Sequence, residues 1–299
     1  MKERLPTYGG QAVIEGVLMR GTRHIAMAMR TPDGSIKLYQ EVLGGIYKKS
    51  WMKFPFLRGL IGLWDALILG MRFLTISANT QSGEDEKLEG LPLYATLAFS
   101  MIIGVGLFFL LPAGAGHLAE TILGWNTFWG NMLEGLVRLV LLVGYIWLIG
   151  KMPDIKRVFQ YHGAEHKTIN AFEAGCELTP ENVAKHSLQH PRCGTSFLLA
   201  LVVLSIFLFA MLGPMPAWAR FASRIVLLPL LASVAYEYIR FVAYHIENRF
   251  FRFIIKPNLA LQKLTTREPS LDQLEVAIAA FSAMYQKEKQ ETAPAPSIS

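Results

Sequence analysis

The segment 161–173 of this 299-residue chain, YHGAEHKTINAFE, holds two histidines and two glutamates. On a helix, where each residue turns about 100°, His162 and His166 lie on one face, about 40° apart. Glu173 returns to within about 20° of His162, and Glu165 lies about 60° to the other side. The run from His162 to His166 is H-x-x-E-H, the inverted form of the zinc-protease signature. Two neutral imidazoles one turn apart can hold a divalent ion, and the intervening glutamate can take a proton from water.

Two histidines do not complete a tetrahedral site, so further ligands must come from elsewhere. Glu173 is the best third ligand by helical phase, and His190 and Cys193 are alternatives if two short helices in the region 151–194 pair. Cys193 reads equally well as a small buried residue at the mouth of an apolar helix. The same residues also fit a polar helix face on a membrane surface. We predict a divalent-metal site, for zinc or a similar ion, with Glu165 as general base and ligands drawn from His162, His166, Glu173, His190 and Cys193.

The regions of the chain that must position the segment 161–173 are rich in apolar residues. The chain is 52% hydrophobic and 17% charged, whereas a soluble domain averages about 25% charged residues. The run 91–116 has no Lys, Arg, Asp or Glu, and three more runs cover about 132–150, 195–213 and 223–246. Each is long enough to cross about 30 Å of hydrocarbon. The sequence therefore predicts a mainly α integral membrane protein with four transmembrane helices.

Charges outside these runs predict the orientation. The segments before the first run, between the second and third, and after the fourth are rich in Lys and Arg, whereas 113–131 has none and 214–222 has only Arg220. The positive-inside rule places both termini and the 151–194 loop in the cytoplasm. We attribute the net charge of +6 to contact with anionic lipids of the bilayer. No basic stripe interleaved with aromatic residues stands out, so no nucleic-acid partner is expected.

The remaining regions are predicted from turn and capping signals. The stretch QAVIEGVLMRG reads as one strand, and Pro32-Asp33-Gly34 predicts a hairpin after it. The segment 54–77 reads as an amphipathic helix on the membrane surface. The predicted division is 1–50, a small β-rich cytoplasmic unit; 51–90, the amphipathic helix and a polar connector; 91–150, two spans; 151–194, the loop with the HxxEH helix; 195–246, two more spans; 247–288, a C-terminal cytoplasmic helical region; and 289–299, a disordered tail.

Three local expectations bear on the site. Pro153 and Gly175 predict the start and stop of the HxxEH helix, and a second helix is expected from Thr179 to His190. A helix from near Ser270 carries an apolar stripe for packing on a neighbour: Leu271, Leu274, Ile278 and Phe281. Inside the spans, helical spacing predicts that charged neighbours neutralise each other as Glu134–Arg138 and Glu237–Arg240, with Glu237 the better candidate to line a cavity beneath the metal.

Four blocks of the chain, GGQAVIEGVLMRG, YHGAEHKTINAFE, HPRCGTSF and LTTREPSLDQLEVAI, resemble the YqhQ-like family of bacterial membrane proteins. That family is a domain-of-unknown-function group described as predicted metal-dependent enzymes, and the resemblance covers nearly the whole chain. It implies a multi-pass protein of the bacterial cytoplasmic (inner) membrane. Residues here that match its blocks are Gly9, Gly10, Glu15, Gly16, His162, Glu165, His166, Glu173, His190, Arg192, Cys193 and Glu275.

These observations favour a membrane-embedded, metal-dependent enzyme, hydrolytic in class, that acts from the cytoplasmic side. Its substrate would be a lipid-linked molecule or a membrane-proximal peptide. The first alternative is a non-enzymatic membrane protein in which the same residues form a structural metal site or polar hub. The second alternative is a homo-oligomeric transporter or channel built around the charges inside the spans.

Overall fold

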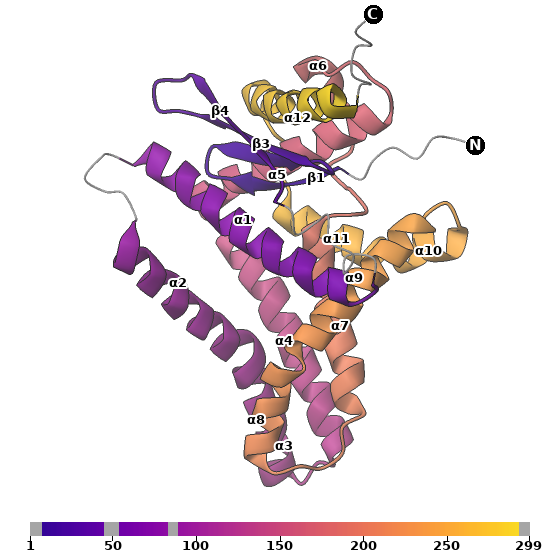
Figure 1. Cartoon of the computed structure of the whole chain (residues 1–299). Coiled ribbons are helices and arrows are strands. Elements are labelled where there is room, and N and C mark those ends of the chain that lie inside the picture. Colours follow the sequence, from indigo (N-terminus) through magenta and orange to yellow (C-terminus); the bar gives the residue numbers. More distant parts are fainter. Residues whose placement is uncertain (1–7, 45–53, 83–88, 293–299) are drawn as a thin grey trace, which may run out of the picture.

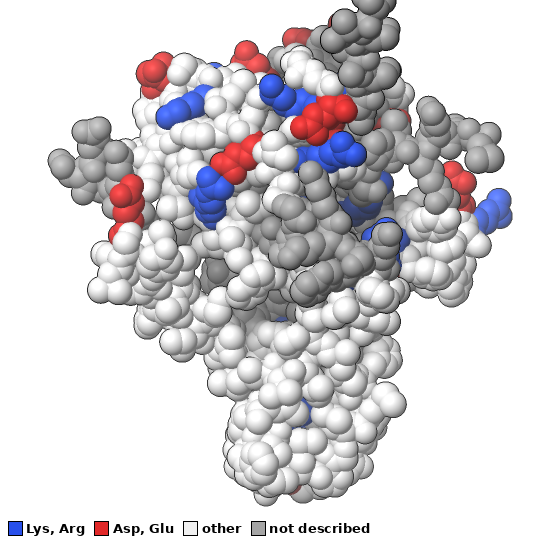
Figure 2. All heavy atoms as spheres, viewed as in Figure 1, with Lys and Arg blue, Asp and Glu red and all other residues white. Residues whose placement is uncertain are grey.

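The computed structural model describes residues 8–44, 54–82 and 89–292. It has a polar half, formed by a small sheet with the helices α5, α6 and α12, and an apolar half formed by long helices (Figure 1). Charged side chains gather over the polar half, and the opposite half is nearly free of them on the face seen in Figure 2. The uneven distribution of apolar residues along the sequence therefore corresponds to two halves in space.

The sheet is an antiparallel meander in the order β1-β2-β3-β4. The predicted strand 11–21 is wrong as one element, because the chain turns at Ile14 and Glu15, and Glu15 has a φ of 53°. A Cβ on Gly16 would lie 2.3 Å from the Ala28 carbonyl oxygen, so glycine is required there. The hairpin at Gly34, with a φ of 86°, is confirmed. The strands are β1 (Gly9–Val13), β2 (Gly16–Arg20), β3 (His24–Arg30) and β4 (Ile36–Val42).

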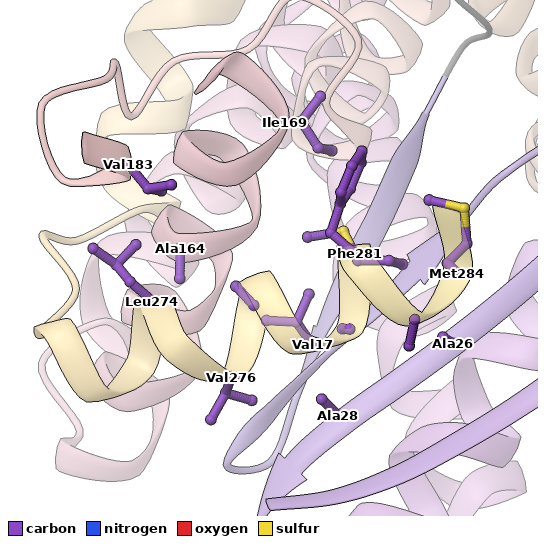
Figure 3. Packing of buried hydrophobic residues seen from close by; sticks show 14 of the residues in the cluster. Val17, Ala26, Ala28, Ala164, Ile169, Val183, Leu274, Val276, Phe281 and Met284 are labelled. Carbon is purple, nitrogen blue, oxygen red and sulfur yellow. The ribbon is translucent and has the colours of Figure 1, made fainter. Parts of the chain in front are cut away.

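Helices cover both faces of this sheet. On one face α12 (Leu271–Thr292) packs against β2, β3 and α5, with Phe281 and Met284 buried among sheet residues such as Val17 (Figure 3). On the other face Phe73 of α1 (Leu57–Gln81) is buried with side chains of β2 and β3. The apolar stripe predicted for α12 is confirmed for Leu274 and Phe281, but Leu271 is 51% exposed because it lies in the first turn, outside the core.

The apolar half contains α2 (Gly90–Val105), the π-helical turn η4 (Gly106–Leu110) and α3 (Leu111–Leu123) as one continuous stretch, followed by α4 (Thr127–Ile149) and α7 (Gly194–Ala210). After these, α8 (Ala217–Val226) and α9 (Leu228–Tyr244) form a pair bent by 42°. Within the described residues, three helices are long and apolar enough to cross a membrane, or up to four if the bent pair is one span. The four predicted runs are all helical, but α1 joins the candidate set and α7, with 17 residues, is shorter than the others.

The helix that carries the HxxEH motif is confirmed. It is α5 (Pro153–Glu173), and Gly175 follows its end with a φ of 74°. The second helix, expected to reach His190, is wrong: α6 has only four residues (Pro180–Val183). The chain after α6 turns at Ala184 and Lys185 and continues to Cys193 without helix or strand. Its carbonyl groups accept hydrogen bonds from α5; the Lys167 amine, for example, donates to the Ala184 carbonyl at 2.6 Å.

The chain after α9 is helical up to Thr292. It contains α10 (Arg249–Ile254), then α11 (Lys256–Thr265), which packs on α7 and α4, and finally α12. The start of the predicted disordered tail, 289–292, is therefore the last turn of α12, and 293–299 lies outside the described residues. Likewise α1 continues to Gln81, into the predicted polar connector, of which 83–88 is not described.

Candidate metal centre

Three of the predicted ligands lie together. The ligand atoms of His162, His166 and Cys193 are all within 4.8 Å of one another, and His162 Nε2 is 3.2 Å from Cys193 Sγ. In a tetrahedral zinc site, with Zn–N and Zn–S distances of about 2.0 and 2.3 Å, neighbouring ligand atoms are roughly 3.5 Å apart. Two imidazoles and one thiolate are a donor set that zinc accepts. We call these three residues the histidine–cysteine cluster.

Both imidazoles of the cluster are oriented by backbone carbonyl groups. His162 Nδ1 lies 2.9 Å from the Thr265 carbonyl oxygen, and His166 Nδ1 lies 2.5 Å from that of Leu188. A carbonyl oxygen only accepts, so each Nδ1 must carry the proton and donate it. In the neutral form of such a ring Nε2 is the unprotonated nitrogen, which can bind an ion. This is the second hydrogen bond that metal-binding histidines commonly make.

Four elements meet at the cluster, and one glycine permits their approach. The histidines come from α5, Leu188 from the irregular segment after α6, Thr265 from the end of α11, and Cys193 caps the N-terminus of α7. A Cβ on Gly163 would lie 2.2 Å from the Arg267 carbonyl oxygen and 2.8 Å from Leu188 Cδ2. The glycine inside the HxxEH motif therefore allows two distant segments to reach the face of α5.

Glu165, the predicted general base, is buried and faces strand β1. Its carboxylate accepts a hydrogen bond from the Gly10 backbone N–H, and burial raises its pKa to about 7 although that hydrogen bond and His162 oppose the shift. A Cβ on Gly10 would lie 2.5 Å from the Leu18 carbonyl oxygen and 3.1 Å from Glu165 Cδ, which explains this glycine. A carboxyl group with a pKa near neutrality is suited to exchange protons at neutral pH.

Glu173 and His190 lie beside the cluster rather than in it. The Glu173 carboxylate pairs with Arg192, and its other oxygen is 3.8 Å from His190 Nε2. Burial raises the pKa of Glu173, but the contact with His190 and the charge of Arg192 outweigh this, so the pKa is lowered. Burial lowers the pKa of His190, although Glu173 opposes this. Helical phase placed Glu173 on the same face of α5 as the two histidines, but it could not reveal that Arg192 pairs with the Glu173 carboxylate.

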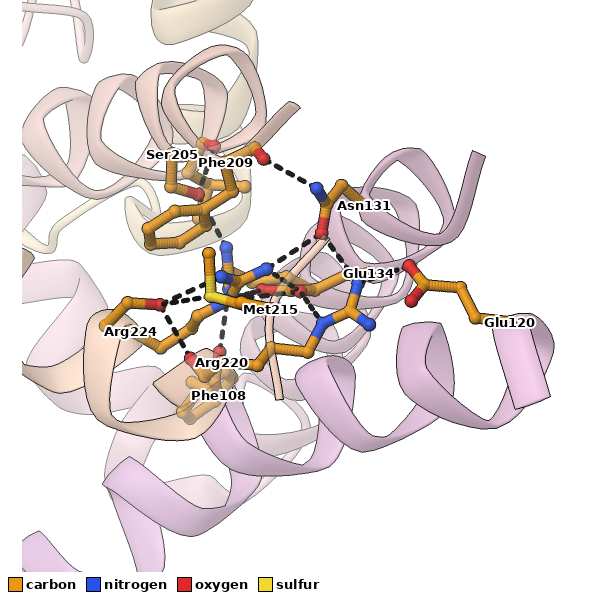
Figure 4. A network of polar contacts seen from close by, with 12 residues as sticks. Phe108, Glu120, Asn131, Glu134, Ser205, Phe209, Met215, Arg220 and Arg224 are labelled. Carbon is orange, nitrogen blue, oxygen red and sulfur yellow. Dashed lines mark hydrogen bonds and ion pairs between the residues drawn. The ribbon is translucent and has the colours of Figure 1, made fainter. Parts of the chain in front are cut away.

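Sequence reasoning missed most of a second polar cluster, in the apolar half (Figure 4). The predicted pair Glu134–Arg138 is confirmed at 2.7 Å, but Arg224 also binds Glu134 at 2.6 Å. Arg220, expected in a short connection, lies in α8 and pairs with Glu120 at 2.8 Å. We call this cluster the arginine network; its members are Glu120, Asn131, Glu134, Arg138, Ser205, Arg220 and Arg224.

Glu237 is also paired differently from the prediction. Its carboxylate accepts hydrogen bonds from Arg58 of α1 at 2.7 and 2.5 Å and from the Phe56 backbone N–H at 3.2 Å. The predicted partner on the same helix, Arg240, contributes only a weaker charge interaction, so the main partner of Glu237 was not predicted. A partner on another helix leaves no spacing signal in the sequence. The contact binds the start of α1 to α9, so Glu237 is a link between these helices.

The sequence profile described as "Protein of unknown function (DUF1385)" matches residues 54–287, more than half of the chain. The chain belongs to the DUF1385 family. It is also 36% identical over 298 residues to a Bacillus subtilis (strain 168) protein named "Uncharacterized protein YqhQ", a match that covers 95% of this chain and 93% of that protein. The resemblance to the YqhQ-like family is thereby confirmed. No solved structure matches.

The DUF1385 match includes both polar clusters. It begins just before α1 and ends within α12, so it contains the histidine–cysteine cluster and the arginine network but not the four strands of the sheet. The match to the relative from Bacillus subtilis covers 95% of the chain, so it includes at least most of the sheet as well. The contact between Gly10 of β1 and Glu165 of α5 therefore joins a region inside the family match to one outside it.

Proposed function

We propose that this protein is a membrane-embedded, metal-dependent enzyme, hydrolytic in class, whose site faces the cytoplasm. The observation that carries the proposal is the pair of imidazoles in which each Nδ1–H is held by a carbonyl, with a ligand atom of each ring and Cys193 Sγ all within 4.8 Å of one another. Three protein ligands with a fourth position left for water or substrate are typical of catalytic rather than structural zinc sites. In this proposal His162, His166 and Cys193 hold a divalent ion, with zinc the best fit.

The roles of the chain's own groups follow from their positions. A zinc ion supplies Lewis acidity and makes water acidic enough to lose a proton near neutral pH. Glu165 would hold and release a proton at its carboxylate, because burial raises its pKa to about 7. Glu173, Arg192 and His190 support the cluster from one side without binding the ion.

The location of the cluster supports a substrate at the membrane. Cys193 caps α7, an apolar helix, and α11 joins the cluster to α4 and α7. The charged residues gather on the side of α5 and the sheet (Figure 2). With the positive-inside rule, this supports a multi-pass protein of the bacterial cytoplasmic membrane with both termini in the cytoplasm. The substrate would be a lipid-linked molecule or a membrane-proximal peptide reached from that side.

A structural metal site is the second candidate, and burial favours it. His166 is 1% exposed and Cys193 6% exposed, and the cluster joins α5, α7 and the end of α11. An ion held there by four protein ligands would fix these elements together without any reaction. The two candidates differ in one property, which is whether a coordination position is open.

Cobalt substitution separates the two candidates. The full chain is purified in detergent, treated with a chelator and loaded with Co²⁺, and its visible spectrum is recorded before and after addition of azide. We expect a thiolate-to-cobalt band that is absent in Cys193→Ser and present in the control His186→Ala. A shift of the cobalt bands on adding azide supports an open position and hence the enzyme. No shift supports the structural site, and a wild-type protein without the thiolate band contradicts both.

A further inference from the structure

A cavity of about 470 Å³, open to solvent, lies beside the histidine–cysteine cluster. It is lined by α5, the irregular segment after α6, and residues at and just after the end of α11. None of the three cluster residues lines it, so it is a separate space from the candidate metal centre. The lining residues that carry the argument are Lys167, His186, Leu188, Lys263, Thr266 and Glu268.

The wall of this cavity has more positive than negative groups. Lys263 is exposed on α11, and its amine makes no hydrogen bond or ion pair with any residue that the structure describes. The Lys167 side chain is 5% exposed and pairs with Glu268 at 2.5 Å, but the Glu268 side chain is 65% exposed and lies at the rim. His186 adds a further nitrogen donor when protonated. One carboxylate therefore faces two ammonium groups and an imidazole, an arrangement that attracts an anion.

The buried lysine has a donor to spare. An ammonium group carries three N–H bonds, and Lys167 uses two of them, on the Ala184 carbonyl at 2.6 Å and on Glu268. Lysine ammonium groups bind phosphate as point charges without a fixed geometry. A doubly charged phosphate monoester matches two ammonium groups and an imidazole better than a single carboxylate does. The volume is that of a site for a small molecule or a headgroup.

We propose that this cavity binds a phosphate monoester group, through Lys263, the free N–H of Lys167, and His186. The group can belong to a soluble phosphate compound or to the headgroup of a lipid, since α11 packs directly on the apolar helices α4 and α7. The site stands whether or not the histidine–cysteine cluster holds a metal.

The anion would lie next to the groups that orient the cluster. Leu188 lines the cavity, and its carbonyl accepts from His166. Thr266 lines it too, and the carbonyl of the preceding residue, Thr265, accepts from His162. Lys167 follows His166 directly on α5. A bound anion therefore contacts the segments that hold both imidazoles, which gives a direct physical route from the cavity to the cluster.

The binding test uses the full chain in detergent, with inorganic phosphate titrated by calorimetry. Lys263→Gln is compared with Lys256→Gln, which also replaces an exposed lysine of α11 but one outside the cavity. Because a hydrogen bond to a charged group contributes about 1.5 kcal/mol or more, Lys263→Gln should weaken phosphate binding about tenfold or more. Lys256→Gln should bind as the wild type does. Absence of binding, or equal binding by both variants, overturns the proposal.

A second experiment, with lipids, identifies whether the phosphate group belongs to a lipid or to a soluble compound. Thermal stability is measured in nanodiscs of phosphatidylcholine with and without phosphatidic acid, whose headgroup is a phosphate monoester. Stabilisation by phosphatidic acid that is lost in Lys263→Gln supports a lipid ligand. Phosphate binding without this stabilisation supports a soluble one.

The phosphate titration is repeated after chelation, with the metal content of each variant measured. Binding that survives chelation supports a separate anion site. Binding that disappears with the metal would mean that phosphate binds the ion itself, and the cavity assignment would then be wrong. Absence of metal in the wild type contradicts the proposed function but not this site, because the titration is read independently.

Discussion

The two buried polar clusters of this molecule differ in how fully their hydrogen-bonding groups are used. In the arginine network, Arg138 donates to Glu134, to Ser205 and to the Phe108 carbonyl. The only buried nitrogen of the network without a hydrogen bond, among the described residues, is Arg220 Nε, which lies 3.8 Å from a Glu134 oxygen. In the histidine–cysteine cluster, by contrast, each imidazole donates from Nδ1 to a backbone carbonyl, and among the described residues the second nitrogen of His162 meets only the Cys193 thiol, at 3.2 Å.

This difference teaches that the number of buried charges is a poor guide to function. Charged groups inside apolar helices are costly and are often functional, and on that ground alone the arginine network would be the stronger candidate. Its donors and acceptors, however, satisfy one another, which is the property of a structural link between α4, α7 and α8. The histidine–cysteine cluster has acceptors without donors, which is the property of a binding site. The predictions below test this contrast, from the largest expected effect to the smallest.

The largest effect is expected for Glu134→Gln. Glu134 is fully buried and pairs with both Arg138 and Arg224, so the amide leaves two buried guanidinium groups without a counter-charge. Removing one partner of a buried ion pair destabilises a protein by about 3–5 kcal/mol. Unfolding in detergent should show this loss, while the metal content of the folded fraction stays at the wild-type level. Glu181→Gln, an exposed change on α6, is the control. A stable Glu134→Gln variant would show that the network is not a structural link.

A smaller effect is expected for Gly163→Ala. The added Cβ would meet the Arg267 carbonyl oxygen at 2.2 Å, and a backbone atom cannot move aside as a flexible side chain can. Forcing an extra methyl group into a packed site costs about 1–3 kcal/mol. Because this contact brings Leu188 and Arg267 to α5, metal affinity should fall with stability. Gly144→Ala, in a helix of the apolar half where a Cβ would meet nothing within 4 Å, is the matched control. Equal behaviour of the two variants would contradict the role given to Gly163.

The smallest effect tests what distinguishes the arginine network from the histidine–cysteine cluster. It asks whether the distinction is the full use of hydrogen-bonding groups or the position in the molecule. Glu288 lies in the polar half, and its hydrogen-bonding groups are also fully used. Its carboxylate accepts hydrogen bonds from Thr22 Oγ1 at 2.6 Å, from the Arg23 N–H at 2.6 Å and from the His24 N–H at 2.8 Å. We expect Glu288→Gln to lose about 1–2 kcal/mol at pH 7 and to keep its metal. Loss of metal in this variant would contradict the distinction.

The difference in unfolding stability between wild type and Glu288→Gln should depend on pH in a defined direction. Burial raises the pKa of Glu288, but the bonds from Thr22, Arg23 and His24 outweigh it, so its pKa is below the ordinary value of 4.5. A carboxyl group with a lowered pKa stabilises the folded state above its ordinary pKa, and this is lost as the pH falls through the lowered value. Wild type and Glu288→Gln should therefore differ most near neutral pH and converge in acid. Unfolding measured across this range checks the convergence.

Much of the fold was predictable because it depends on local patterns. Hydrophobic runs predicted the apolar helices, Pro153 and Gly175 bounded α5, and the i, i+4 spacing placed His162 and His166 on one face. The irregular segment after α6 was not predictable. Its backbone carbonyls accept hydrogen bonds from α5, and because every residue has a carbonyl, such contacts leave no signal in the sequence. Its residues gave a false signal for a helix, since Thr179 and Pro180 start one that tertiary hydrogen bonds end after four residues.

The candidate site was predictable only where one helix carries it. Cys193 was left open as a ligand because its distance from α5 depends on how α7 packs. Glu173 had the right helical phase, but Arg192 takes its carboxylate. In the apolar half, the spacing of Glu134 and Arg138 predicted their contact, whereas Arg224 reaches Glu134 from a helix about 90 residues later in the chain. Contacts between helices leave no periodic signal in one sequence.

The central claim is that His162, His166 and Cys193, and not Glu173, hold a divalent metal. The most direct test is the metal content of purified wild type, Cys193→Ser and Glu173→Gln, measured by elemental analysis of the folded, monodisperse fraction. We predict about one zinc or similar ion per chain in the wild type, as expected for a single site. Cys193→Ser should lose most of it, and Glu173→Gln should keep it. A wild type without stoichiometric metal, or a site emptied by Glu173→Gln but not by Cys193→Ser, would contradict the claim.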